Sequence, residues 1–210
     1  MSRAKKRIVQ KLLCLCLAVS LLSMTSSFAA RNNYEWEYPY DPIPITMMYE
    51  GSWDPSFKQA FYRAMSTWNT VKHPTNGRLL CYFQTSSSSS NTIRLGRLFD
   101  QGLLGYCYLY PKFSGDVPPH TKLDYFEIVI NTGEHNFTDG AKPGYYDIQS
   151  VIQHELGHAL GIAHCHETGG DGCQNTMHNN TLENTTYQRY LKDYDISSKQ
   201  IIYWEAKSDD

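Results

Sequence analysis

The sequence predicts a single α+β domain with a mixed, twisted five-stranded sheet, two long helices and a helix near the C-terminus. The chain has 210 residues, enough for one substantial domain and too few for two ordinary ones. Five short runs rich in β-branched and aromatic residues are separated by Ser, Gly and Pro, as strands and turns are. Two longer segments repeat apolar residues at helical spacing.

The N-terminal segment is typical of a secretory signal. The first eleven residues carry five basic side chains and no acid, and an apolar run follows from Leu12 to Leu22. This run is far shorter than the ~20 residues that a membrane-spanning helix needs. Small residues at Ser27 and Ala29 favour cleavage after Ala29, although an uncut anchor is the alternative. We expect residues 1–29 to be a signal peptide and residues 30–210 to be a secreted, extracellular domain without a membrane span.

The charge of the mature chain disfavours a nucleic-acid partner. Removing five of the 19 basic residues with the signal leaves 14 against 21 acidic residues, a net charge near −7 with neutral histidines. Domains that bind nucleic acid usually carry a basic patch. We therefore expect no nucleic-acid partner, and we expect a monomer.

Four cysteines remain after signal removal, and an even count in an oxidising compartment predicts two disulfides. Four cysteines allow three connectivities. Loop proximity favours Cys165 with Cys173 and, by remainder, Cys81 with Cys107, although the sequence alone leaves the connectivity open. A structural zinc site using Cys165, His166 and Cys173 is the alternative.

The first strand and the first helix follow a short lead-in, residues 30–44, which is aromatic and Pro-rich ("YEWEYPYDPIP"). The segment "ITMMYE" then predicts a strand. Asp54 is the expected N-cap of the helix, with Pro55 at the first helical position. One face of this helix is apolar and is expected to be core: Phe57, Ala60, Phe61, Ala64, Met65, Trp68 and Val71.

Four further strands are predicted from "LLCYFQT", "NTIRLG", "LGYCYLY" and "DYFEIVINT". The second helix begins near Asp147. A closing helix in "DYDISSKQIIYW" is expected to be capped by Asp195 or Ser197. The apolar face of the second helix carries Ile148, Val151, Ile152, Leu156 and Ala159.

The segment "HELGHALGIAH", from His154 to His164, holds three of the eight histidines. His154 and His158 project from the same helical face, one turn apart. A catalytic zinc uses three protein ligands and leaves the fourth position to water. His164 can join only if the helix ends, because ten more helical residues would place it roughly 15 Å further along the axis. Gly161 can end the helix, so one zinc ion held by all three histidines is predicted.

Glu155 lies beside the first of these histidines and need not bind the metal. Zinc lowers the pKa of a bound water, and a carboxylate that accepts its proton creates a nucleophile for a polarised carbonyl. The same carboxylate can then pass the proton to a leaving amine. Glu155 is therefore the predicted catalytic base and acid of peptide hydrolysis.

These residues resemble a known family: "HELGHALGIAH" matches the H-E-x-x-H-x-x-G-x-x-H signature of the metzincin zinc metallopeptidases, and "NTMHNN" resembles their Met-turn, with Met177 as the methionine. The order of predicted elements is similar to a matrixin-like catalytic domain. The resemblance implies a metzincin-like zincin fold and a secreted zinc-dependent metalloendopeptidase acting on peptide or protein substrates. It also implies that Met177 packs beneath the metal without binding it.

The resemblance further implies where the substrate lies. The residues of "LGYCYLY" would form the edge strand on which an extended substrate docks through backbone hydrogen bonds. Val151 and the segment after Met177 would line the specificity pocket. The edge-strand positions concerned are Gly105, Tyr106, Cys107 and Tyr108.

The sequence also departs from parts of the family. Asn179 stands two residues after Met177, where astacin- and serralysin-type metzincins have a tyrosine, so no tyrosine ligand is expected. Matrixins that are kept latent by a propeptide cysteine need this cysteine ahead of the catalytic domain. No cysteine precedes Cys81 in the mature chain, so this kind of latency is not expected either. A carboxylate of the lead-in, from Glu35, Glu37 or Asp41, is the remaining means of capping the metal, with a disordered tail as the alternative.

Calcium and two other functions stay open from the sequence. The segment "NTGEHNFTDG" offers oxygen ligands for calcium, although a solvated turn explains the same residues. A secreted zinc-containing binding or adhesion module without peptidase activity is the main alternative function, and an intact Glu155 counts against it. Zinc endoribonucleases space three histidines similarly but do not share the glutamate after the first one.

Overall fold

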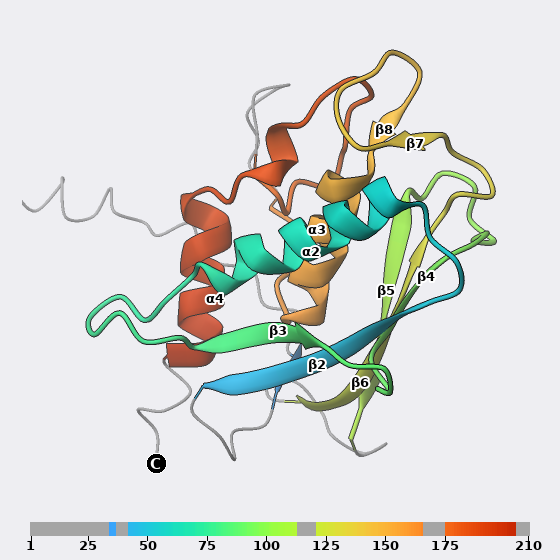
Figure 1. The fold of residues 1–210 in the computed structure, drawn as a ribbon. Helices are drawn as coiled ribbons and strands as arrows, with labels where there is room; N and C mark the ends of the chain where they lie inside the picture. The colour runs from blue at the N-terminus through green and yellow to red at the C-terminus, as the bar shows by residue number, and fades with distance from the viewer. Residues whose placement is uncertain (1–33, 37–41, 113–120, 166–174, 205–210) are drawn as a thin grey trace, which may run out of the picture.

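The computed structural model describes residues 34–36, 42–112, 121–165 and 175–204 (Figure 1). Within these residues, no helix is long and apolar enough to cross a membrane. The predicted signal peptide, the lead-in residues Glu37 and Asp41, and Cys173 all lie outside the described residues.

The main sheet contains five long strands and one short addition. Four strands run parallel to one another in the order β3, β2, β4, β6, and β5 pairs antiparallel with β6. The short β1 pairs in parallel with the first two residues of β6. The bounds are β1 (Tyr34–Glu35), β2 (Ile43–Glu50), β3 (Cys81–Thr85), β4 (Thr92–Leu95), β5 (Gly105–Pro111) and β6 (Thr121–Ile130).

Three α-helices in the described part of the chain accompany the sheet, and Figure 1 shows α2 and α3 crossing on the same side of it. They are α2 (Pro55–Asn69), α3 (Ile148–Ala159) and α4 (Asp193–Trp204). The smaller elements are β7 (Phe137–Thr138) and β8 (Tyr146–Asp147), which pair in parallel, and the 3-10 helix η2 (Tyr187–Arg189). Within the described residues, this mixed α/β arrangement of a five-stranded sheet, extended by the short β1, with three helices confirms the mixed sheet and the helices that the sequence predicts, while the metzincin-like fold stays a prediction.

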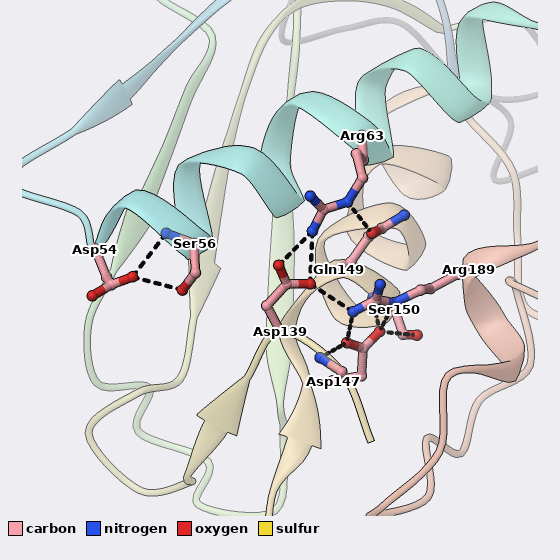
Figure 2. A network of polar contacts seen from close by, with 9 residues as sticks. Asp54, Ser56, Arg63, Asp139, Asp147, Gln149, Ser150 and Arg189 are labelled. Carbon is pink, nitrogen blue, oxygen red and sulfur yellow. Dashed lines mark hydrogen bonds and ion pairs between the residues drawn. The ribbon is translucent and has the colours of Figure 1, made fainter. Parts of the chain in front are cut away.

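Helix α2 forms where its capping residues and apolar stripe predict. The Asp54 carboxylate accepts a hydrogen bond from Ser56 N at 2.8 Å, and Pro55 occupies the first turn (Figure 2). Phe61 and Trp68 are fully buried on the face that packs into the core. Burial of each such side chain contributes about 1.5–3 kcal/mol before entropic costs. The stripe is therefore core, as expected, and α2 packs against β3 of the sheet and against α3.

The described residues 34–36 of the lead-in belong to the folded domain. Glu35 lies in β1 and its carboxylate pairs with Lys122 Nζ at 2.6 Å, with only 6% of the residue exposed. This carboxylate is held by a lysine of β6 and does not cap the histidines. Trp36 packs against the core, with its ring edge-on to Phe126.

The predicted Cys81–Cys107 disulfide is wrong. Both thiols are free in the structure. Cys81 begins β3, at one edge of the sheet, whereas Cys107 lies in β5, at the opposite edge. Three strands separate them, so no side-chain rotation brings the sulfur atoms together. The pairing of Cys165 with Cys173 stays a prediction, because Cys173 lies outside the described residues.

Candidate metal centre

Helix α3 begins and ends where the sequence predicts. The Asp147 side chain caps its N-terminus by accepting from Ser150 N at 2.9 Å and from Ser150 Oγ at 2.6 Å. At the other end Gly161 has φ of 82°. Its N–H donates to His158 O at 2.8 Å, and Ile162 N donates to Gly157 O at 3.0 Å. This pair of bonds is a Schellman motif, which ends the helix and turns the chain back.

The turn brings His164 to the two histidines of the helix. The Nε2 atoms of His154, His158 and His164 lie 3.1 Å from one another in all three pairs. They form the one cluster of potential metal-binding side chains found in the described part of the chain. Three nitrogen lone pairs that converge at this distance repel one another unless a proton or a cation lies between them.

The remaining ring nitrogens show which atoms are free for a ligand bond. His154 Nδ1 donates to Thr176 O and His158 Nδ1 to Ile162 O, each at 2.8 Å. Because a carbonyl oxygen only accepts, the proton of each neutral ring is on Nδ1 and the lone pair is on Nε2. Burial lowers the pKa of His154 well below its ordinary value, and burial together with the neighbouring His164 lowers the pKa of His158 to about 4. Both rings are therefore neutral at physiological pH.

This donor set fits a zinc ion. Zinc binds imidazole nitrogen at about 2.0–2.1 Å in tetrahedral geometry, which separates two ligand nitrogens by roughly 3.3–3.4 Å. The observed 3.1 Å separations are close to this value. The three histidines could hold zinc through their Nε2 atoms, which would leave a fourth coordination position for another ligand.

A buried carboxylate holds the peptide group that orients His154. The peptide between Thr176 and Met177 accepts from His154 Nδ1 through its carbonyl, while its N–H donates to Asp195 Oδ1 at 3.1 Å. The other carboxylate oxygen of Asp195 accepts from Thr176 N at 3.0 Å and from Lys192 N at 2.8 Å. The sequence suggested Asp195 only as a helix cap, because nothing local showed that it reaches the Met-turn.

Met177 packs against the turn of α3 that lies between His154 and His158. It is fully buried, and a Cβ atom added at Gly157 would collide with its sulfur. The methionine side chain thus lies directly against Gly157, where a larger residue would not fit. The role of Met177 as a packing base beneath the metal, which the resemblance implies, stays a prediction.

Glu155 lies beside the histidines, at the wall of a cleft. It is 5% exposed, and burial raises the pKa of its carboxyl to about 8. A Cβ atom added at Gly105 would come within 2.8 Å of Glu155 Oε1 and 3.1 Å of the Val151 side chain. The edge strand β5 therefore passes directly over the glutamate, and only a glycine at position 105 allows this approach.

The cleft has a volume of about 690 Å³ and is bounded by β5, α3 and the segment after the Met-turn. Of the predicted edge-strand residues, Gly105, Tyr106 and Cys107 line it. Tyr108 does not line it, but packs its exposed ring against Tyr106. The remaining lining includes all three histidines, Glu155 and Val151, the apolar Leu103, Leu104, Leu109 and Tyr146, and the neutral polar Asn179, Asn180 and Thr181.

A network of four charged side chains, shown in Figure 2, fastens the N-terminus of α3 to its surroundings. Arg189 binds Asp147 through Nε at 2.8 Å and through Nη2, and it also binds Asp139 at 2.7 Å. Arg63 of α2 donates to both oxygens of Asp139 at 2.6 Å and to Gln149 Oε1 at 2.8 Å. The network joins α2, α3 and η2, and it was not predicted from the sequence.

The loop between the Met-turn and η2 is closed at its base. Thr176 Oγ1 donates to Gln188 O at 2.9 Å, and Gln188 Nε2 donates to His178 O at 3.1 Å. Gln188 is 6% exposed. The cleft-lining residues Asn179–Thr181 therefore belong to a loop whose two ends are bonded to each other.

The possible calcium site finds no support. Of the acidic residues in "NTGEHNFTDG", Asp139 is bound by Arg63 and Arg189, and Glu134 pairs with Arg97 at 3.0 Å. Guanidinium groups thus occupy the oxygen atoms that calcium would need.

Comparisons with known proteins add little to this description. No protein family matches the sequence, and no curated protein matches it. Among solved structures the chain is similar to high choriolytic enzyme 1, a hatching enzyme zinc-protease from the medaka fish Oryzias latipes. The two share 15% identity over 80% of this chain and 94% of that chain, with a TM-score of 0.46. Because this likeness is distant, the functional conclusion rests on the geometry of the metal centre.

Proposed function

We propose that the protein is a secreted zinc-dependent metalloendopeptidase of the metzincin type, with a matrixin-like catalytic domain. The observation that carries the proposal is the convergence of three imidazole nitrogens, 3.1 Å apart, next to a buried carboxylate that faces the same cleft. His154, His158 and His164 hold the zinc. A zinc ion held there would supply a Lewis acid that polarises a substrate carbonyl and lowers the pKa of water toward neutrality.

Glu155 serves as the general base and acid. Burial alone raises the pKa of its carboxyl to about 8, and a bound dication would lower this pKa and favour the ionised form that accepts a proton. It accepts a proton from the attacking water and delivers this proton to the departing amine nitrogen. Its position on α3, one residue after the first ligand, fixes the carboxylate relative to the reacting carbonyl.

The cleft supports an extended peptide as substrate. Strand β5 is an edge strand, so the backbone groups on its free side are available to pair with another extended chain. Its Gly105, Tyr106 and Cys107 already line the cleft beside Glu155. A peptide paired with β5 would pass its scissile bond across the three histidines.

The test compares two substitutions in the purified mature chain. Glu155→Gln should retain zinc and fold normally, but should lower peptide hydrolysis by about 10²- to 10⁴-fold, the usual loss when a general base is removed. His164→Ala should lose zinc affinity together with activity, because it removes a ligand. Zinc content is measured by elemental analysis and hydrolysis with a peptide library, with and without a chelator.

Three results would refute the proposal. The first is a wild-type protein that takes up no zinc. The second is a zinc-loaded wild-type protein that cleaves no peptide, and the third is a Glu155→Gln variant that cleaves as fast as the wild type. Zinc uptake without any cleavage would instead favour the binding or adhesion module.

A further inference from the structure

We propose that Trp36, Tyr194 and Tyr203 are positioning residues for the third zinc ligand. Their hydrogen-bond donors hold the backbone that connects His158 to His164. This inference rests on the proposed function, since it concerns the same metal centre, and it assigns to the N-terminal strand and to α4 a task in building that centre.

The backbone after the second ligand needs outside partners. The last carbonyl groups of a helix have no partner within the helix and must be satisfied otherwise. The Schellman motif at Gly161 satisfies the carbonyls of Gly157 and His158. The carbonyl groups from Ala159 onward take no part in this motif, and they belong to the segment that leads to His164.

Aromatic side chains from two distant elements supply these partners. Trp36 Nε1 donates to Ala159 O at 2.9 Å, and Tyr203 Oη donates to Leu160 O at 3.0 Å. Tyr194 Oη lies 3.3 Å from Ala163 O and 3.2 Å from His164 O, so that one hydroxyl proton is shared between two carbonyls. The carbonyl of Ile162, between these two pairs, accepts from His158 Nδ1.

The burial of these donors makes the bonds strong and specific. Tyr203 is 1% exposed and Tyr194 8% exposed. Trp36 is half-buried against the core. A carbonyl group left without a partner in such surroundings is costly, so the turn keeps its shape only while the aromatic donors are present. They therefore hold His164 in its binding position before any metal arrives, which lowers the ordering cost of zinc binding.

The experiment removes one donor at a time from the full mature chain, with Trp36→Phe, Tyr194→Phe and Tyr203→Phe. Each variant keeps an aromatic ring and loses only the N–H or O–H, apart from the smaller ring at position 36. Zinc affinity is measured by competition with a coloured chelator, and unfolding of the zinc-free protein by denaturant. We expect zinc affinity to fall about two- to tenfold for each variant, the equivalent of one hydrogen bond. Peptide hydrolysis should recover when zinc is added in excess.

Two matched controls separate positioning from general packing. Trp53→Phe removes an indole donor to Glu50 O at 2.9 Å, and Tyr110→Phe removes a hydroxyl donor to Glu127, both away from the metal centre. These variants should keep wild-type zinc affinity even if their stability falls.

The outcomes distinguish the inference from the proposed function. Wild-type zinc affinity in all three test variants would overturn the inference alone, as would equal losses in the controls. If Tyr203→Phe does not fold, Trp36→Phe and Tyr194→Phe decide the question in the same way. Failure of the wild-type chain itself to bind zinc would overturn the proposed function, and the inference with it.

Discussion

Replacing Gly161 with alanine tests whether the turn after α3 creates the metal centre. Gly161 has φ of 82°, in the left-handed region, where a residue with a Cβ atom pays about 1–2 kcal/mol. Both hydrogen bonds of the Schellman motif depend on this conformation. Gly161→Ala therefore stores about 1–2 kcal/mol of strain at the bend that carries His164.

Part of this strain lowers the free energy of unfolding of the zinc-free protein, and the rest weakens zinc binding. Both losses can be measured. With zinc bound, His164 must occupy its place, so the zinc-loaded protein loses the full 1–2 kcal/mol. Without zinc, the turn can open locally and relieve part of the strain. The part relieved reappears as weaker zinc binding, and 1.4 kcal/mol corresponds to a tenfold loss. The two losses, in zinc-free stability and in zinc binding free energy, should therefore sum to the loss in the zinc-loaded protein.

The assay combines denaturant unfolding, with and without zinc, and chelator competition. Gly77→Ala is the matched control, since Gly77 has φ of 70° and an added Cβ atom there meets nothing within 4 Å. It should lose similar stability in both forms and keep its zinc affinity. If Gly161→Ala retained wild-type stability and zinc affinity, the role assigned to the turn would be wrong. The same conclusion would follow if Gly77→Ala weakened zinc binding equally.

Three further substitutions have expected outcomes. Gly157→Ala should lower the free energy of unfolding in denaturant by about 1–3 kcal/mol, because the added Cβ atom overlaps Met177. This overpacking outweighs the better helix propensity of alanine. Unchanged stability would mean that Met177 moves freely. Asp195→Asn should lower the free energy of unfolding by about 1–3 kcal/mol in the same assay, because an amide has one acceptor oxygen for three backbone N–H groups. Unchanged stability would contradict the role of Asp195 at the Met-turn. Gly105→Ala should lower peptide hydrolysis while zinc content stays constant, because the new Cβ atom displaces the Glu155 carboxylate; kinetics and elemental analysis together check this.

The helices, the strands and the ligand turn were predictable because their signals are local. Asp54 and Asp147 cap the helices that their positions indicate, and the apolar stripe of α2 is buried as its spacing predicts. The end of α3 at Gly161 followed from one geometric requirement, namely that His164 must turn back toward its partners. Such features depend on neighbours within a few residues, and the sequence shows these directly.

Features that depend on strand order or distant partners could not be predicted in this way. The wrong pairing of Cys81 with Cys107 assumed that the two remaining thiols meet, whereas the sheet order separates them. Arg63 meets Asp139 across 76 positions, and Trp36 meets Ala159 across 123. The sequence shows which residues are charged or aromatic, but which residues they contact depends on the fold.

The closed base of the loop between the Met-turn and η2 has a consequence for how this molecule can change. Because residues at the two ends of the loop are hydrogen-bonded to each other, a change of sequence inside the loop should leave the positions of the metal ligands unchanged. Loop length matters little to stability, since each doubling costs about 0.6 kcal/mol. We expect the intervening residues to behave as an exchangeable cassette: grafting a different sequence between positions 179 and 187 would reshape one wall of the cleft and alter which peptides are cut, with the zinc chemistry left intact.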